Sequence, residues 1–261
     1  MDKYCIVGKN LSTSLSPFIY HYIFEKFNIG AKYIPIEKDI SNIRDFITNL
    51  KAEGFSAAHI CSPFKKIAME LVDSNDSSTN SVSFINVKDD KLLGDDNDYS
   101  AMAYFSLEKG IYEKNILVIG DGPEAESIVQ SFVRTQNKVY KYGIEDEIDY
   151  SPEYYILVNA ISDIGNTDDS LALAKKIDFS KLKHLSFAID IAEDTYETVF
   201  LKEAIKNNIV SIDGLYFLAI KVTLFLHTMY ETPIYFSTDE IYQVLAEKAE
   251  KKKLNNLHLS L

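Results

Sequence analysis

Residues 115–125 read NILVIGDGPEA, and this stretch decides the fold. The apolar run Ile116–Ile119 predicts a buried strand, and the residues after the glycines, from Glu126 to Thr135, have the apolar spacing of a helix. In a dinucleotide-binding turn, the first glycine permits the tight bend and the second lets the backbone approach a diphosphate. A tight turn without a ligand is the alternative. The strand before the glycines and the helix after them favour nucleotide binding, although Pro123 removes one backbone N–H that would meet phosphate.

Strands and helices alternate on both sides of this stretch. Upstream, the apolar spacing predicts strand, helix, strand, helix and strand at Lys3–Val7, Ser16–Asn28, Lys32–Ile36, Ile40–Leu50 and Phe55–Cys61. A hairpin (Ser83–Val87 with Lys91–Leu93) and a turn at Gly94–Asp98 follow a polar loop at Asp73–Ser81. Downstream, further strands are expected at Lys138–Tyr142, Tyr155–Asn159 and Leu185–Ile191. This alternation predicts mostly parallel sheets that are covered by helices on both faces.

The fold class that follows is α/β, with two domains and a cleft between them. Residues 1–98 are expected to form a mixed or parallel α/β substrate domain, which the helical residues 218–261 complete. Residues 99–217 are expected to form a Rossmann-like dinucleotide-binding domain. Two helices, Tyr99–Lys109 and Leu215–Met229, would bridge the domains, and closure of such a cleft usually gates catalysis.

Composition excludes several classes of protein. Lysine and arginine number 27 against 39 acidic residues, so the net charge is −12, and a surface of this sign repels nucleic acid. The longest apolar block, Leu215–Leu226, is too short to span a membrane and contains Lys221. Cys5 and Cys61 suit a reducing compartment, so we expect a cytoplasmic protein, monomeric or homodimeric, whose partner is a small molecule. The five histidines lack the spacing of metal ligands, so no metal is expected.

Two further motifs carry candidate chemistry. Ser14 and Ser16 flank a predicted helix start before Pro17, where hydroxyls and free N–H groups can hold a carboxylate. The simpler interpretation is that Ser16 caps the helix. Lys65 follows a buried strand by a few residues, at the edge where α/β proteins bind ligands, and a lysine there can move a proton. A solvated surface lysine is the alternative.

Taken in order, these motifs resemble those of the shikimate dehydrogenase family over nearly the whole chain. The family's Ser-x-Ser-Pro is Ser14–Pro17 here, its Asn-Val-Thr-x-Pro-x-Lys is His59–Lys65, its Ala-Val-Asn-Thr is Phe84–Val87, and its Gly-x-Asn-Thr-Asp is Gly94–Asp98. Further matches are the glycine turn, Asn159-Ala160, and an Asp–Thr–Leu run at Asp190, Thr198 and Leu201.

The resemblance implies a reaction and a set of site residues. The reaction is the NADP-dependent, reversible reduction of 3-dehydroshikimate to shikimate in aromatic amino acid (chorismate) biosynthesis. Lys65 would move the hydroxyl proton, and Asp98 would orient both the hydroxyl and Lys65. Substrate-binding residues would be Ser14, Ser16, Cys61, Asn86 and Lys221. Cofactor-binding residues would be Gly120, Asp121, Gly122, Pro123, Glu124, Ala125, Tyr142, Asn159 and Gly214.

Several positions depart from the family pattern. The family's Thr, Tyr and Gln are replaced by Cys61, Glu193 and Lys221, and the Asn-Arg-Thr that grips the 2′-phosphate of NADP is absent after Tyr142. Acidic residues at this place, Glu145 and Asp146 here, normally select NAD, so NAD stays possible. Two alternatives therefore remain open. One is a paralogue acting on quinate, aminoshikimate or a related ring hydroxy acid. The other is a small-molecule-binding protein that has lost turnover, against which the retained Lys65 and Asp98 argue.

Overall fold

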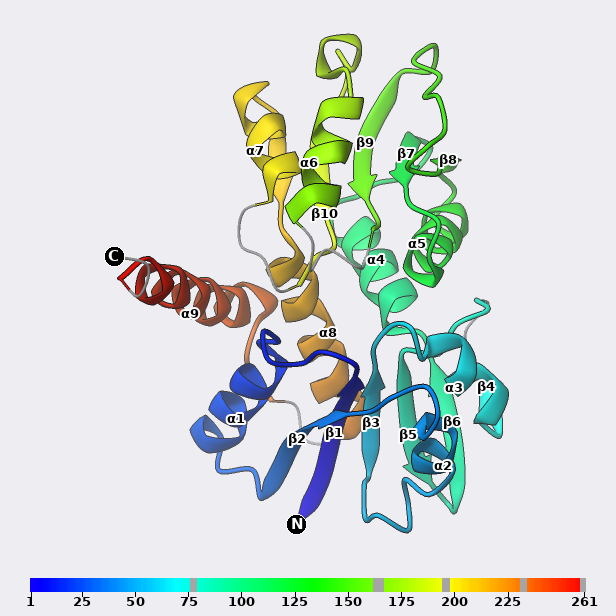
Figure 1. The fold of residues 1–261 in the computed structure, drawn as a ribbon, viewed down its shortest axis with the longest axis vertical. Coiled ribbons are helices and arrows are strands. Elements are labelled where there is room, and N and C mark those ends of the chain that lie inside the picture. The colour runs from blue at the N-terminus through cyan, green and yellow to red at the C-terminus, as the bar shows by residue number, and fades with distance from the viewer. Residues whose placement is uncertain (76–78, 162–166, 194–197, 231–233, 259–261) are drawn as a thin grey trace.

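The structure is a computed structural model, and it describes the chain except for residues 76–78, 162–166, 194–197, 231–233 and 259–261. Figure 1 shows two α/β halves, one above the other, with helices running between them. The strands of the first half lie in residues 2–95 and those of the second half in residues 115–212. The expected α/β architecture with two sheets is confirmed, whereas the domain boundaries stay a prediction.

The first half is built on a mixed sheet. Its strands are β1 (Asp2–Gly8), β2 (Ala31–Glu37), β3 (Ala57–Ile60), β4 (Ser74–Asn75), β5 (Phe84–Lys88) and β6 (Lys91–Asp95), in the order β2-β1-β3-β5-β6-β4. β1 runs parallel to β2 and β3, while β5 is antiparallel to β3 and β6. Helices α2 (Ile43–Thr48) and α3 (Lys65–Leu71) pack on one face of the sheet. Helices α1 (Ser16–Lys26), α8 (Gly214–Met229) and α9 (Thr238–His258) pack on the other.

The second half is built on a parallel sheet in the order β11-β10-β9-β7-β8. Its strands are β7 (Asn115–Ile119), β8 (Lys138–Tyr142), β9 (Tyr154–Asn159), β10 (Phe187–Asp190) and β11 (Val210–Ile212). Ile116 and Val118 face the core of α4 (Asn97–Glu108), α5 (Pro123–Arg134) and α8. Leu117 and Ile119 face the core of α6 (Thr167–Lys176) and α7 (Val199–Lys206), as the strand period of two requires.

The order of these strands fixes where a ligand can bind. From β7 the chain moves outward to β8 on one side, and β9 then pairs on the other side of β7. At such a reversal the loops after the two central strands diverge and leave a crevice at their carboxyl ends. The glycine turn follows β7 and Asn159 ends β9, so the two predicted cofactor motifs flank this crevice.

Helix α8 ties the halves together. Leu215, Leu218 and Val222 belong to the core of the first half, and Phe217 and Ile220 belong to the core of the second. Its apolar character all round is that of a buried helix. Within the described residues, no helix is both long enough and apolar enough to cross a membrane.

Several local expectations were wrong. Ile40 does not belong to the stripe of α2, because the helix begins at Ile43 and leaves Ile40 69% exposed. The expected loop at Asp73–Ser81 contains the short strand β4, and the sequence pattern missed α6, α7 and β11 altogether. Ser16 does not cap α1, because the capping position is Leu15 and Ser16 lies inside the first turn.

Two helix starts also differ from expectation. The predicted turn at Gly94–Asp98 is instead the end of β6 followed directly by α4, because the carboxylate of Asp96 accepts the backbone N–H groups of Asp98 and Tyr99 and so starts the helix. Helix α5 begins at Pro123 rather than at Glu126, since proline suits the first helical position. The earlier start of α5 places Glu124 in its first turn.

Candidate active site

The centre of the molecule is where loops from both sheets meet. The carboxyl ends of β1 and β9 point toward the middle of the molecule, where α4 and α8 lie (Figure 1). Lys65 begins α3 and is only 6% exposed. Its Nζ donates to Oδ2 of Asp98 at 2.6 Å and to Oε1 of Glu124 at 2.5 Å. Since Asp98 lies in the first turn of α4 and Glu124 in that of α5, three helix starts converge on one ammonium group.

A second lysine extends this arrangement. The ammonium of Lys221, on α8, donates to Oδ1 of Asp98 and to Oε1 of Glu193, in the loop after β10. We call Lys65, Asp98, Glu124, Glu193 and Lys221 the ion cluster. It contains two cations and three carboxylates, a formal charge of −1. Burying charged groups costs free energy that only close, well-oriented ion pairs recover. Asp98 contacts both lysines, so it is the carboxylate that compensates the charge of each.

The ion cluster fixes the protonation state of its members. Burial disfavours the charge on Lys65, but contact with Asp98 and Glu124 outweighs burial and raises the pKa of Lys65 above its ordinary value. The pKa of Lys221 is raised against burial in the same way, chiefly by Asp98 and Glu193. The pKa of Asp98 is lowered, because the two lysines outweigh its burial. At neutral pH Lys65 is therefore an ammonium group, which is a proton donor.

A neighbouring carboxylate, Asp96, organises the backbone under the ion cluster. It is fully buried, and besides capping α4 it accepts from Thr79 at 2.7 Å, from Ser83 at 3.1 Å and from Ser127 at 2.5 Å. Ser127 lies on α5, so this hydrogen bond joins the two halves. The hydroxyl of Ser83 also accepts the N–H of Asn97. Asp96 therefore holds α4, and with it Asp98, in place.

Replacing Asp96 with alanine is expected to lower the free energy of unfolding by about 3 kcal/mol or more. The change removes a helix cap, worth about 1 kcal/mol, and leaves buried hydroxyl donors without an acceptor. Urea denaturation followed by circular dichroism measures the loss. Asp96→Asn is the matched control: its amide oxygen still accepts hydrogen bonds, so it should lose clearly less. Equal stabilities for wild type and Asp96→Ala would contradict this account of Asp96.

The turn after β7 has the shape that a dinucleotide needs. Gly120 has a φ of +152°, and a Cβ there would lie 2.6 Å from the carbonyl oxygen of Ala160. The N–H of Gly120 donates to the carbonyl of Tyr142 at 2.9 Å, which binds the turn to the end of β8. Gly122 takes the capping position of α5 and contributes no side-chain cap, so the helix amino end can receive an anion. These residues fit the diphosphate of a dinucleotide.

The loop after β8, which contacts the glycine turn through Asp121, is surrounded by side chains of both charges. A carboxylate oxygen of Asp121 accepts from the N–H of Ile144 at 3.4 Å, and that of Asp146 accepts from the N–H of Gly143 at 2.7 Å. Two cations lie beside the same loop: Lys176 donates to the carbonyls of residues 143 and 144, and Lys141 is paired with Glu126. A 2′-phosphate would meet Lys141 or Lys176 here in place of the family's arginine.

The remaining predicted cofactor residues are backbone supports. Ala125 is buried beneath Gly120. Asn159 is fully buried at the end of β9, where its Oδ1 accepts from the N–H of Ile161. Gly214 starts α8 so close to the loop after β10 that a Cβ would lie 2.2 Å from the carbonyl oxygen of Ala192. Close backbone approach, rather than a side-chain contact, explains the glycine at 214.

The predicted substrate residues differ in position: Ser14, Ser16 and Cys61 follow or flank elements that pack near α8, whereas Asn86 lies elsewhere on the first sheet. Leu15, between Ser14 and Ser16, packs in the same core cluster as Leu218 of α8, and Cys61 packs against this cluster. The loop that carries both serines therefore packs near α8. Their own polar contact is the N–H of Ser16 donating to Oγ of Ser14 at 3.3 Å.

Asn86 is not brought to the ion cluster. It pairs with Ala57, at the start of β3, so it lies four residues of strand, roughly 13 Å, from the Cys61 end where Lys65 follows. Phe84 is the residue of β5 nearer that end, because it pairs with His59 and with Asp95. The role of Asn86 stays a prediction that rests on the resemblance alone.

The rings of Tyr20, Tyr33 and His59 pack together near Lys221, and no sequence pattern predicted this group. Tyr20 stacks on Tyr33 with ring centroids 4.0 Å apart, and the hydroxyl of Tyr33 is hydrogen-bonded to Nδ1 of His59 at 2.9 Å. Burial and the nearby Lys221 lower the pKa of His59 to about 3, so this imidazole is neutral. Its Nε2 is buried with no hydrogen-bond partner among the described residues. A neutral imidazole with a buried ring nitrogen suits hydrogen bonding to a polar ligand.

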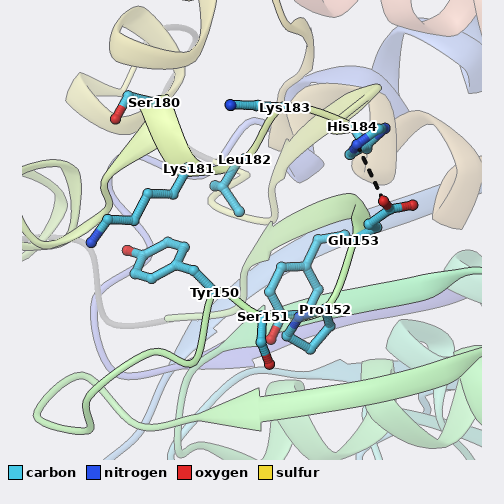
Figure 2. A pocket seen from close by; sticks show the side chains of 10 residues that line it. Tyr150, Ser151, Pro152, Glu153, Ser180, Lys181, Leu182, Lys183 and His184 are labelled. Carbon is cyan, nitrogen blue, oxygen red and sulfur yellow. Dashed lines mark ion pairs between the residues drawn. The ribbon is translucent and has the colours of Figure 1, made fainter.

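Two cavities differ in size and in whether they touch the ion cluster. A cavity of about 10 Å³, room for one water molecule, lies against Asp98 and Lys221 with apolar walls from Met102, Ile128, Ile191 and Phe217. A much larger hollow of about 480 Å³ lies between residues 150–154 and 180–184 (Figure 2). That hollow is at the amino end of β9, opposite the crevice, and an ion pair between His184 and Glu153 borders it. The small cavity therefore touches the ion cluster, whereas none of the residues that line the large hollow belongs to it.

In the part of the chain that the structure describes, no group of three or more His, Cys, Asp or Glu side chains is arranged to hold a metal ion. Of the acidic residues at this turn, Asp96 caps α4 and Asp98 forms ion pairs with lysines.

Comparisons with known proteins agree with the architecture. Residues 6–87 match the family model described as the shikimate dehydrogenase substrate binding domain. A shikimate dehydrogenase (NADP(+)) from Pelagibacter ubique is 27% identical over 234 residues, covering 81% of this chain and 86% of that protein. A protein of the same name from Pyrococcus furiosus is 27% identical over 241 residues, covering 82% of this chain and 85% of that protein.

Solved structures show the same fold at lower identity. Shikimate dehydrogenase 1 from Peptoclostridium difficile superposes with a TM-score of 0.77 and 21% identity, covering 95% of this chain and 99% of that one. Shikimate 5-dehydrogenase from Thermus thermophilus, in complex with NADP(H) and shikimate, superposes with a TM-score of 0.80 and 18% identity, covering 95% of this chain and 100% of that one.

Proposed function

We propose that the chain is a member of the shikimate dehydrogenase family and catalyses the NADP-dependent, reversible reduction of 3-dehydroshikimate to shikimate. The observation that carries the proposal is the buried Lys65–Asp98 pair, which lies where the two halves meet. The residue types and their order match the catalytic pair implied by the family resemblance. A place in the biosynthesis of aromatic amino acids follows from the family and belongs to the same proposal.

The chain's own residues supply the proton that the reduction needs. NADPH, when bound, supplies the hydride that reaches the carbonyl carbon of the substrate. Lys65 donates a proton from Nζ to the carbonyl oxygen, which becomes the new hydroxyl group, and the neutral amine then regains a proton from solvent. In the oxidation, the neutral amine accepts the hydroxyl proton. The carboxylate of Asp98 aims Nζ and stabilises the ammonium form before each reduction.

Binding of the ring acid would fall to the groups around α1 and α8. Ser14 and Ser16, at the amino end of α1, would hold the substrate carboxylate by hydroxyl and backbone N–H groups. Lys221 and Glu193 present one cation and one carboxylate beside Asp98, where they would orient the ring hydroxyls. Cys61 would provide a thiol where the family has a hydroxyl.

The nucleotide would lie in the crevice of the second half. The amino end of α5, opened by Gly120 and Gly122, would hold the diphosphate, and Tyr142 and Asn159 end the strands on either side. The relatives' names support NADP, and Lys141 and Lys176 are the cations available for its 2′-phosphate.

Initial rates with four substrate and cofactor pairs test this function. Purified full-length protein is assayed for reduction of NADP or NAD with shikimate or quinate, by absorbance at the wavelength of the reduced nicotinamide. Shikimate with NADP is expected to have the highest kcat/KM. A higher value with quinate or with NAD would make the protein a paralogue with another substrate or cofactor. Absence of turnover with every pair would leave a binding protein and reject the enzyme.

A further inference from the structure

Glu124 has a position that its place in the glycine turn does not require. It belongs to residues 120–125, which would hold the anionic diphosphate, and it adds a negative charge there. Its side chain is nevertheless buried and points away from the turn, into the ion cluster. Oε1 accepts from Lys65 at 2.5 Å and from the hydroxyl of Ser62 at 2.5 Å. Oε2 is buried and has no hydrogen-bond partner among the described residues.

These contacts cross between the two halves of the molecule. Ser62 and Lys65 follow β3 of the first sheet, whereas Glu124 follows β7 of the second. Lys65 therefore has one carboxylate partner from α4, Asp98, and one from the nucleotide half, Glu124. Asp98 is shared with Lys221, but Glu124 has Lys65 as its cation. Burying a carboxylate is costly unless a cation faces it. The burial of Glu124 therefore depends on its contact with Lys65.

We propose that Glu124 is a positioning residue for proton transfer: from the nucleotide half, it holds Nζ of Lys65 in place and keeps that group protonated. The proposal rests on the proposed function, since it concerns the same lysine. Glu124 touches Lys65 and acts through it. When the halves are closed, Lys65 has two carboxylate partners and is held as a proton donor, and separation of the halves would withdraw one of them.

The charges around Lys65 give the direction of the effect. Asp98 and Glu124 face Nζ directly, Lys221 lies across Asp98, and Asp96 lies beneath α4. Removing one contacting carboxylate leaves Asp98, which is also paired with Lys221, as the only carboxylate in contact with Nζ among the described residues. An opposite charge at contact distance shifts a pKa by about 1–3 units. Neutralising Glu124 should therefore let Lys65 lose its proton at a pH lower by about one unit or more.

Chemical labelling measures the pH at which Lys65 loses its proton, and it needs no enzymatic turnover. Wild type and Glu124→Gln are treated with trace acetic anhydride across a pH series, and acetylation of Lys65 is read by peptide mass spectrometry against the neighbouring exposed Lys66. Glutamine keeps the shape of Glu124, so the midpoint of the labelling curve reports protonation. We expect the Lys65 midpoint to fall by about one pH unit or more. Glu126→Gln, on the same helix, is the matched control and should leave it unchanged, because Glu126 pairs with Lys141.

The pH profile of the reduction is the second measurement. The basic limb of kcat/KM, where Lys65 loses its proton, should move down by the same amount in Glu124→Gln. A merely structural role would lower thermal stability and leave the basic limb where it is.

Each outcome decides for or against Glu124. An unchanged Lys65 midpoint in Glu124→Gln, or an equal shift in Glu126→Gln, overturns the proposal. Glu124→Asp withdraws the carboxylate by one methylene group but keeps its charge. A Lys65 midpoint between those of wild type and Glu124→Gln would support the proposal. This variant also serves as the test if Glu124→Gln folds poorly. If wild type reduces no 3-dehydroshikimate, the proposed function fails, and the labelling curves still decide the role of Glu124.

Discussion

Replacing Lys65 with methionine is expected to lower kcat for the reduction of 3-dehydroshikimate by about 10²–10⁴-fold, the usual contribution of a positioned proton donor. Methionine preserves much of the length and apolar stem of lysine but has no proton to donate. The substrate contacts proposed for Ser14, Ser16 and Lys221 would stay in place, so KM for the ring acid should change far less than kcat. Steady-state rates at saturating NADPH measure both constants.

Two controls separate this chemical effect from loss of the fold. Lys66→Met removes the adjacent, exposed lysine and should leave kcat unchanged. Lys65→Met also leaves Glu124 without its cation, and breaking a buried ion pair costs about 3–5 kcal/mol, so the thermal midpoint must be measured alongside. A folded Lys65→Met protein that keeps more than a tenth of wild-type kcat would show that another group supplies the proton.

The second large effect is expected for Asp98→Asn, which should lower kcat by about 10²-fold or more. Asparagine keeps the shape of the side chain, but its single amide oxygen carries no charge for the two lysines that share Asp98. Without that anion Lys65 and Lys221 repel each other, and Nζ of Lys65 loses its aim at the substrate oxygen. Wild-type kcat in a folded Asp98→Asn protein would contradict the pairing described here.

Asp98 also predicts how stability changes with pH. Its pKa in the folded protein lies below its ordinary value near 4, so its ionised form stabilises the fold above about pH 4, and this contribution is lost as the pH falls toward the folded pKa. The stability difference between wild type and Asp98→Asn should therefore be largest near pH 6 and shrink toward pH 3. Urea denaturation of both proteins at several pH values measures it. A difference that grows as the pH falls would have the wrong sign.

Residue patterns predicted the frame of this molecule well. The run Ile116–Ile119 followed by Gly120 and Gly122 predicted a nucleotide-binding sheet, and the structure has the strand, the turn and the helix there. Such features are local: an apolar strand and a glycine at positive φ depend on residues next to one another. The contact of Lys65 with Asp98 was implied by the family resemblance, because no local pattern connects residues 33 positions apart.

The parts that sequence missed depend on where helices start and on which side chains meet. The inward path of Glu124 follows from α5 beginning at Pro123, three residues before the predicted start, and an acidic residue in a first turn is otherwise explained by the helix dipole. The placement of Asn86 away from the ion cluster follows from the register of β3 with β5, which residue types alone leave open. Asp96 is a hub because Thr79, Ser83 and Ser127 converge on it in space.

In the function proposed for this chain, the buried ammonium of Lys65 supplies the proton for the reduction of 3-dehydroshikimate. The most direct measurement is the initial rate of NADPH oxidation with 3-dehydroshikimate at pH 7, for wild type and for folded Lys65→Met side by side. We expect steady turnover by wild type and a rate at least about 100-fold lower for the variant. No oxidation by wild type, or equal rates for the two proteins, would contradict it.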